Sequence, residues 1–379
     1  MIKKSIFLFF LVLLFSCTEK TPLPLTTDEN VGEIKTVSYV ASESYTGGPV
    51  IVNTGLSRYL YVGEVDAKKC AALLRFDNIP DSSEIISAQL ELIANDSIIV
   101  NEMPFDVVIY KSPQHFESLE VTSENFSWNS WTEEMSRATV TTADTDTVVF
   151  DIDKDWVETW KDSLDNTGLV IATDAIGVAR RFGSTSIASV SPVLNLVFRL
   201  ESSTENDTVL LVPTADAFIY QQGPEIPTGP LYLSTIDEYR SILRFNLTSI
   251  PDNATINEAE LFLTVDSVNS FLSPEGIIIN SYRLEDAGND PFTVAIDSAF
   301  SLDSDIVIIP GNQTAVVDLS FIVQQWTRQD TSSYDNYGLI LFPRVKYNIF
   351  SRVAFYNTDA EIDKVPKLTI HYTIPPSQE

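Results

Sequence analysis

The chain has 379 residues, of which 24 are basic and 53 acidic, and its formal net charge is −29. A surface of this sign repels nucleic acid and anionic membranes and favours solubility. The composition therefore excludes a nucleic-acid-binding protein. A solvated exported surface explains the acidity better than an acidic binding function does.

The first residues have the pattern of an export signal. Lys3 and Lys4 precede an unbroken apolar run at 6–15. This run is too short to span a bilayer as a helix and is typical of the apolar region of a signal peptide. We therefore expect a signal at 1–16. Its removal takes away Lys3 and Lys4 from the 24 basic residues and no acids, so the mature chain carries 22 basic and 53 acidic residues, a net charge of −31.

The sequence LLFSC that ends at Cys17 resembles a bacterial lipobox, and lipoproteins of the Bacteroidota often end their signals in SC. The resemblance implies that the Cys17 thiol carries lipid and becomes the mature N-terminus. Two or more acyl chains anchor a protein stably, so we expect an outer-membrane lipoprotein that faces the cell surface or the periplasm. An ordinary secretory signal with an incidental cysteine is the alternative. The polar, Pro- and Thr-containing residues 17–34 predict a flexible tether.

Two copies of one unit follow the tether. LLRFDNIPDSSEIISAQLEL at 73–92 is matched by ILRFNLTSIPDNATINEAELFL at 242–263, and YLYVG at 59–63 is matched by PLYLS at 230–234. Self-similarity at a fixed spacing indicates duplicated structural units. We expect one domain at 35–200, a short polar linker at 201–208 and a second domain at 209–375.

Each unit has mainly the pattern of β-strands. AQLELIA, AELFLTV and PKLTIHYTI alternate apolar and polar residues with period two, as half-buried strands do. One stretch per unit instead has helical spacing: Ile152, Trp156 or Val157, and Trp160 in the first unit, where the helix is expected to stop at Gly168, and Leu319, Ile322 or Val323, and Trp326 in the second. We expect Asp151 and Asp318 to cap or precede these helices and each tryptophan to close the end of its sandwich. The predicted fold class is all-β, with two tandem jelly-roll β-sandwich domains that each contain one short helix.

The series ADAFI, LYLS, SILRFNLTSIP, INEAELFL, VVDLSFIVQQW, NYGLIL and PKLTIHYTI resembles the DNRLRE domain. The resemblance implies jelly-roll sandwiches of secreted proteins, some of which are classed as carbohydrate-binding modules. It covers residues 35–374 and is more complete in the second unit. The first unit has ASESY at 41–45 where the second has TADAF at 214–218.

Basic residues are scarce, so those that recur in both units are candidate ligand-binding residues. Arg75 and Arg244 lie between apolar neighbours, so alternation turns them away from the core. Each is expected either to pair with a nearby acid or to clamp a sugar hydroxyl or a carboxylate. The stretches after the matched NxGL segments carry basic clusters, with an aromatic residue in the second unit. They form the predicted binding surface, and a charged hairpin tip without a ligand is the alternative. These residues are Arg180, Arg181, Arg344, Lys346, Tyr347 and Arg352.

Two runs of acidic residues leave open the question of whether the protein binds a structural calcium ion. Asp151, Asp153 and Asp155 alternate, and Asp144 and Asp146 lie just before them. Neither run has the Gly and the terminal Glu of an EF-hand loop, so the acids would have to come from separate loops. The sequence does not identify the ligands.

Catalysis has little support. His115 and His371 are the two histidines and have no counterpart in the other unit, and GxSxG, HExxH and P-loop motifs are absent from the sequence. With Cys17 acylated, Cys70 has no partner for an intrachain disulfide and is predicted to be a small core residue.

The first hypothesis is an anchored envelope lipoprotein whose two modules bind a polysaccharide and gain from linked sites. The second is a structural or adhesive protein that docks an envelope protein and binds no glycan. The third is a polysaccharide lyase or hydrolase. Duplication favours the first two, because a catalytic site rarely needs two copies on one chain.

Overall fold

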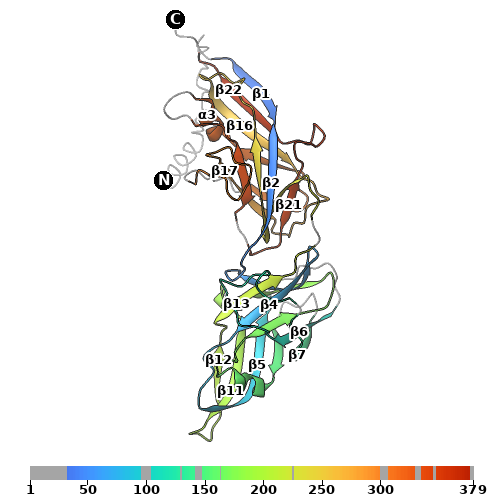
Figure 1. The fold of residues 1–379 in the computed structure, drawn as a ribbon, viewed down its shortest axis with the longest axis vertical. Helices are drawn as coiled ribbons and strands as arrows, with labels where there is room; N and C mark the ends of the chain where they lie inside the picture. Colours follow the sequence, from blue (N-terminus) through green and yellow to red (C-terminus); the bar gives the residue numbers. More distant parts are fainter. Residues whose placement is uncertain are drawn as a thin grey trace, which may run out of the picture.

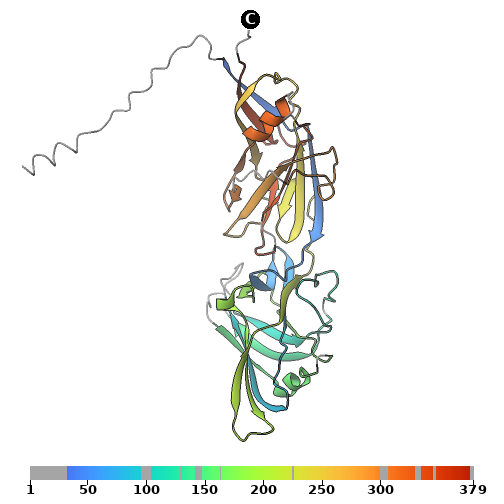
Figure 2. The same cartoon turned by 90° about the vertical axis from the view of Figure 1, so that its left-hand side faces the viewer.

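The computed structural model describes residues 32–94, 104–128, 130–140, 147–162, 164–223, 226–298, 306–328, 334–344 and 347–375. The expected signal, Cys17, most of the tether, Asp144, Asp146 and Lys346 lie outside these residues. The described chain is mostly antiparallel β-structure and forms two sandwiches that stand end to end (Figures 1 and 2). The predicted all-β sandwich fold is confirmed. No helix in the described part of the chain is long and apolar enough to cross a membrane.

The first sandwich is the lower one in Figure 1 and has two sheets. The four-stranded sheet has the order β12 (Asp207–Leu211), β11 (Val193–Leu200), β5 (Ser83–Ile93) and β8 (Thr147–Ile152). The seven-stranded sheet has the order β10 (Ala179–Gly183), β3 (Tyr59–Val65), β4 (Lys68–Arg75), β9 (Leu169–Ala172), β6 (Phe105–Lys111) and β7 (Glu134–Val140), with β13 (Ala215–Tyr220) also paired to β4.

The second sandwich repeats this plan strand for strand. Its four-stranded sheet has the order β1 (Ile34–Val40), β22 (Lys367–Thr373), β16 (Thr255–Thr264) and β19 (Thr314–Asp318). Its seven-stranded sheet has the order β18 (Ile306–Ile308), β17 (Ile277–Arg283), β20 (Leu339–Pro343), β15 (Asp237–Arg244), β14 (Leu231–Ser234) and β21 (Arg352–Phe355), with β2 (Glu43–Ile51) also paired to β15.

One apolar core fills the space between the sheets of each sandwich. Leu74 of β4 faces Leu90 of β5 across the first core, and both are fully buried. The matched residues Leu243 and Leu261 are fully buried in the second core. Burying such side chains from both sheets is the main favourable term in folding a sandwich.

A short α-helix closes each core, as expected: α2 (Lys154–Thr159) and α3 (Ser320–Thr327). Trp160, just after α2, stacks on Phe76 in the first core, and Trp326 of α3 is buried in the second. α2 ends at Thr159 and does not extend to the predicted Gly168. Asp151 precedes α2, one of its two expected roles, but is still paired in β8, and the cap is Asp153, which accepts the hydrogen bond from the N–H of Asp155 (2.8 Å). Asp318 precedes α3 as predicted, and its carboxylate accepts the N–H of Ser320 (2.8 Å).

The two units exchange their first two strands. β1 pairs with β22 and β2 with β15, so residues 34–51 belong to the second sandwich. β12 pairs with β11 and β13 with β4, so residues 207–220 belong to the first. The predicted domain boundaries are therefore corrected. Alternation shows that a strand has one buried face, but it does not show which of two similar sheets covers that face.

The crossings between the sandwiches are residues 52–58 and 221–230. The stretch 201–208, predicted to link the domains, is instead the turn at 201–206 between β11 and β12 of the first sandwich and the first two residues of β12. In the turn, the N–H of Ser203 donates to the carbonyl of Leu200 (2.9 Å). A polar turn and a polar linker have the same composition, so the sequence alone did not separate them.

Deletion of residues 1–51 tests the exchange. We expect amide protection to collapse in β15 and β22, which lose a paired strand, while β4 and β11 keep theirs. Hydrogen–deuterium exchange measured by mass spectrometry on residues 52–379 and on the full chain reports both regions. Loss of protection in β4 and β11, with β15 and β22 unchanged, would contradict the exchange.

Candidate ligand-binding site at the junction of the sandwiches

Arg75 and Arg244 occupy matching positions at the ends of β4 and β15 and point away from the main cores, as predicted. The guanidinium of Arg75 lies 3.0 Å from the carboxylate of Glu117. That of Arg244 lies 2.9 Å from the carboxylate of Glu43 and also donates to the carbonyl of Gly288 (2.7 Å). Both arginines therefore pair with nearby acids, which is one of the two roles expected for them.

Arg180 and Arg181 are buried on β10. Arg181 donates to the carboxylate of Glu275 in the second sandwich (2.8 Å), and its guanidinium lies 4.3 Å from the centroid of the Tyr59 ring. Burial opposes ionisation of Glu275, but the hydrogen bond and the charge of Arg181 outweigh it and hold the pKa of Glu275 below its usual value. Arg181 thus joins the two sandwiches.

The cluster predicted in the second unit lies on the segment that connects β20 to β21 and on Arg352, the first residue of β21. Arg344 is exposed, Tyr347 and Arg352 are half-buried, and Lys346 is outside the described residues. The carbonyl of Asn348, in the same segment, accepts the hydroxyl proton of Tyr61 of the first sandwich (2.9 Å). Part of the predicted binding surface is therefore covered by the other half of the chain.

An aromatic cluster seals one side of the junction. The ring of Phe350 lies 4.8 Å from that of Tyr61, 5.8 Å from Phe218 and 6.3 Å from Tyr220, centroid to centroid. All four side chains are buried, and burial raises the pKa of Tyr61 and of Tyr220. Edge-to-face contacts of this kind add to the stabilisation from buried area.

Four charged side chains form a network across the junction, in which cations and carboxylates alternate. Lys68 and Asp66 come from the first sandwich, and Asp237 and Arg352 from the second. The Lys68 ammonium lies 3.2 Å from Asp237 and 3.6 Å from Asp66, and Arg352 lies 2.8 Å from Asp66. The side chains are between 8% and 17% exposed. Each buried charge has a partner of opposite sign from the other sandwich, so separation would leave desolvated charges unpaired.

The turn between β3 and β4 places Asp66 and Lys68 in this network. Asp66 and Ala67 both adopt left-handed backbone conformations, with φ of 49° and 57°. Two-residue turns of this kind match the twist of a hairpin and favour Gly, Asn or Asp. The β-carbon of Ala67 makes the conformation costly. We attribute the stability of this left-handed conformation at Ala67 to the ion pairs of the flanking residues Asp66 and Lys68.

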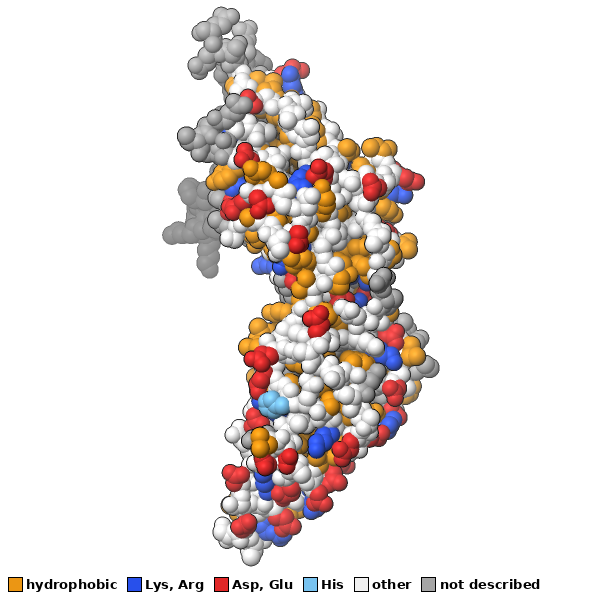
Figure 3. Space-filling view, viewed as in Figure 1, with side chains coloured by type: hydrophobic (Ala, Val, Ile, Leu, Met, Phe, Trp, Pro, Cys, Tyr) orange, Lys and Arg blue, Asp and Glu red, His pale blue; other side chains and the backbone are white. Residues whose placement is uncertain are grey.

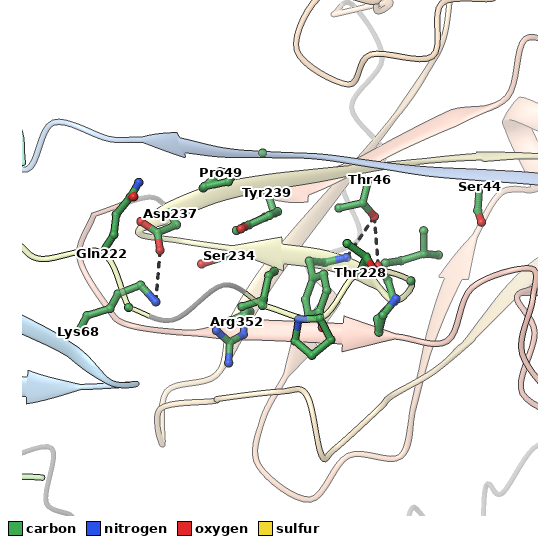
Figure 4. Close-up of a pocket in the computed structure, with 18 residues that line it drawn as sticks. Ser44, Thr46, Pro49, Lys68, Gln222, Thr228, Ser234, Asp237, Tyr239 and Arg352 are labelled. Atoms are coloured by element: carbon green, nitrogen blue, oxygen red, sulfur yellow. Dashed lines mark hydrogen bonds and ion pairs between the residues drawn. The ribbon is translucent and has the colours of Figure 1, made fainter. Parts of the chain in front are cut away.

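A pocket of about 550 Å³ opens beside the network. It lies between strands β2, β14 and β15 of the second sandwich and residues 222–223 and 226–230 of the second crossing (Figure 4). Figure 4 shows Lys68, Asp237 and Gln222 at one end and Thr46 and Ser44 at the other. The volume is in the range typical of small-molecule sites.

The pocket exists because matching strands of the two halves carry side chains of different size. Phe218 of β13 pairs with Ala72 of β4, and Thr46 of β2 pairs with Ser241, the residue of β15 that matches Ala72. The ladders therefore match Thr46 to Phe218, one residue away from the sequence alignment of ASESY with TADAF. Two residues after Thr46, where the register of β2 and β15 shifts, lies Gly48, whose φ of 125° and close approach to the carbonyl of Glu238 disfavour any side chain. The rings that fill the first half are thus absent from the second.

Two polar atoms of residues that line the pocket have no hydrogen-bond partner among the described residues and almost no accessible surface: the hydroxyl of Tyr232 and one carboxylate oxygen of Asp237. These residues are 2% and 8% exposed. The neighbouring hydroxyl of Tyr220 directs its single proton to the carbonyl of Ile236 (3.1 Å). Burial raises the pKa of Tyr232 and so keeps it protonated. Buried polar atoms without partners are costly, and since neither atom is exposed to the pocket, neither can reach a ligand without a local rearrangement.

The sequence analysis missed Thr46, Lys68, Tyr232 and Asp237. A signal was available in the repeats, since YLYVG and PLYLS match Tyr61 to Tyr232. Tyr61 bonds to the other sandwich, whereas Tyr232 lines the pocket. The strand exchange hid the site, because it brings residues from both units together.

The remaining sequence predictions concern a calcium site and Cys70. The described residues contain no group of three or more His, Cys, Asp or Glu placed to bind a metal ion. Asp155 pairs with Lys154 (3.1 Å), and Asp151 accepts a hydrogen bond from Gln89 (2.8 Å). Cys70 is buried as predicted, and burial raises the pKa of its thiol, which makes it a poor nucleophile.

Comparisons with known proteins assign no family. No family model matches the chain, and no curated protein matches it. Among solved structures, the VP2 subviral particle of infectious bursal disease virus is similar at 9% identity, with a TM-score of 0.12, over 92% of this chain and 79% of that one. A TM-score this low does not establish a shared fold.

Replacement of Lys68 by Met tests the ion-pair network. The variant leaves Asp66 and Asp237 partly desolvated without their shared cation, so we expect the free energy of unfolding to fall by about 3–5 kcal/mol, measured by urea denaturation. Lys154→Met, which breaks an exposed pair with Asp155, is the matched control and should change stability little. Equal effects of the two variants would contradict a network that joins the sandwiches.

Proposed function

We propose that the protein is a polysaccharide-binding lipoprotein of the cell envelope and that the junction pocket is its binding site. The observation that carries the proposal is the pocket of about 550 Å³ at the junction, whose lining combines several hydroxyl side chains with the apolar surfaces of Pro49 and Tyr239. The resemblance of the repeated motifs to DNRLRE domains, some of which are classed as carbohydrate-binding modules, supports the same function.

The composition of the pocket wall suits a sugar. A sugar ring has hydroxyls around its rim and C–H groups on its faces, so it needs polar and apolar contacts in one site. The hydroxyls of Ser44, Thr46, Thr228 and Ser234 and the apolar surfaces of Pro49 and Tyr239 line the pocket. A mostly preformed wall with a few converging polar groups is the usual form of a small-molecule site.

The same wall favours binding over hydrolysis. Asp237 is the one carboxylate among the described residues that line the pocket, and Lys68 holds it at 3.2 Å. Glycoside hydrolases generally use two carboxyl groups, one on each side of the bond to be cleaved. A site with one paired carboxylate suits a ligand that is held and released unchanged.

The position of the N-terminus agrees with a lipid anchor. β1 begins at the end of the second sandwich that is farther from the junction (Figure 1). With lipid on Cys17, the tether would attach at that end. The second sandwich would then be closer to the membrane, and the pocket would lie near the middle of the molecule.

Replacement of Thr46 by Phe tests the site. The change copies the side chain of Phe218 onto the matching position, and Thr46 is exposed, so the ring should fill the pocket without disturbing the core. We expect retention on immobilised polysaccharide, measured by affinity electrophoresis and a glycan array, to be abolished while the melting temperature stays within about 2 °C of the parent value.

Ser38→Phe is the matched control, since it places the same ring on an exposed position of β1 and should leave retention unchanged. Retention of Thr46→Phe at the parent level would place the binding site elsewhere. If the parent protein is retained by no polysaccharide, the glycan-binding function is wrong, and the structural or adhesive role becomes the better explanation.

A further inference from the structure

The two exchanged segments are buried to different depths. In residues 34–51, which we call the N-terminal arm, Ala41 is the one buried residue. Apolar side chains of the arm reach the surface, and Ile34 and Val40 are 66% and 46% exposed. In the segment of the second unit that matches the arm, by contrast, all six residues of β13 are buried. Since burial of apolar side chains is the main favourable term in folding, the arm is held much less strongly than β13.

The N-terminal arm runs along the outside of the second sandwich, on a face where hydrophobic and polar side chains are mixed (Figures 1 and 3). Besides its ladders with β22 and β15, it makes polar contacts at the surface. The hydroxyl of Thr36 lies 2.8 Å from Nδ1 of His371, and the carboxylate of Glu43 lies 2.9 Å from the guanidinium of Arg244. Water can replace exposed contacts of this kind, so each adds little to stability. The side chains of the arm therefore do little to hold it in place.

The arm ends where the chain becomes anchored in the first sandwich. Pro49 and Val50 are exposed, whereas Thr54 is 2% exposed and its hydroxyl accepts the N–H of Phe218 of β13 (3.0 Å). Within the arm, the ladder with β15 shifts register between Gly47 and Val50, and such a shift disrupts a ladder locally. Backbone rotation at 51–53 can therefore free the arm while the first sandwich stays intact.

We propose that the N-terminal arm is a releasable wall of the junction pocket, which detaches from β15 and β22 as a unit while the cores of both sandwiches stay closed. Segments with few buried contacts open locally at a lower free energy than the rest of a fold. Four residues of the arm line the pocket: Ser44, Thr46, Gly48 and Pro49. Release of the arm therefore removes one wall of the pocket, and its return restores that wall.

Hydrogen–deuterium exchange of the full chain in detergent tests the release without any substitution. Peptides from β1 and β2 report the arm, and peptides from β13 are the matched control within the same molecule. We expect the arm to exchange at least about tenfold faster than β13. Low concentrations of urea should speed the exchange of β13 much more than that of the arm, because release of the arm exposes little surface.

Thiol labelling gives a second test at buried positions under the two segments. Ser241 of β15 is fully buried opposite Thr46 of the arm, and the native Cys70 of β4 is 2% exposed opposite Tyr220 of β13. The variant Ser241→Cys therefore carries one reporter under each segment. Labelling by iodoacetamide is read from separate peptides, and each rate is divided by the rate of the same thiol in the urea-unfolded chain. We expect the new thiol to be labelled at least about tenfold faster than Cys70.

Two results would overturn the release of the arm. Equal exchange of the arm and of β13, with the same dependence on urea, would show that the arm leaves only when the whole chain unfolds. Fast exchange of β1 alone, with β2 as slow as β13 and the new thiol as slow as Cys70, would show fraying of an edge strand and no release as a unit. If Ser241→Cys fails to fold, exchange of the parent chain decides alone.

Discussion

Each sandwich depends on two strands that reach it from across the junction. β2 completes the second sandwich through β15, and β13 completes the first through β4. A sheet edge left without these strands would expose a row of unpaired backbone groups. Two crossing segments then connect the sandwiches, and separation would break the ion pairs of Lys68, Arg352 and Arg181 across the junction. We infer that the duplicated chain behaves as one body rather than as two modules on a linker.

This rigidity is what allows a pocket to form between repeats. Surfaces that moved freely would not keep Lys68 within 3.2 Å of Asp237, and a preformed site lowers the cost of ordering on binding. The two halves then diverge at matching positions. Phe218 and Tyr220 seal one side with Phe350, whereas Thr46 and Gly48 leave the other side open. A difference in side-chain size between repeats thus converts a structural interface into a candidate site.

The repeats, the strands and the two helices could be predicted because each leaves a local pattern. Alternation in AELFLTV specifies one buried face, and the matched segments specify a second copy. The strand that each strand pairs with could not be predicted. Residues 34–51 fit either of two nearly identical sheets, and the sequence holds no local record of which one they join. The ion pair of Arg181 could not be predicted for a related reason: its carboxylate partner Glu275 is 94 positions away. Tyr232 and Thr46 were missed because their proximity depends on the exchange.

The most direct test of the exchange is a disulfide trap in residues 30–379. Thr46 and Ser241 are directly opposite each other in the β2–β15 ladder, with hydroxyls 3.0 Å apart, and opposed strand residues lie within the range that a disulfide can bridge. Ala72 is the residue that matches Ser241 in the first unit. The account predicts that the variant Thr46→Cys with Ser241→Cys forms an intramolecular disulfide on mild oxidation, and that Thr46→Cys with Ala72→Cys does not. The opposite result would show that each unit keeps its own first strands, and the pocket described here would not exist.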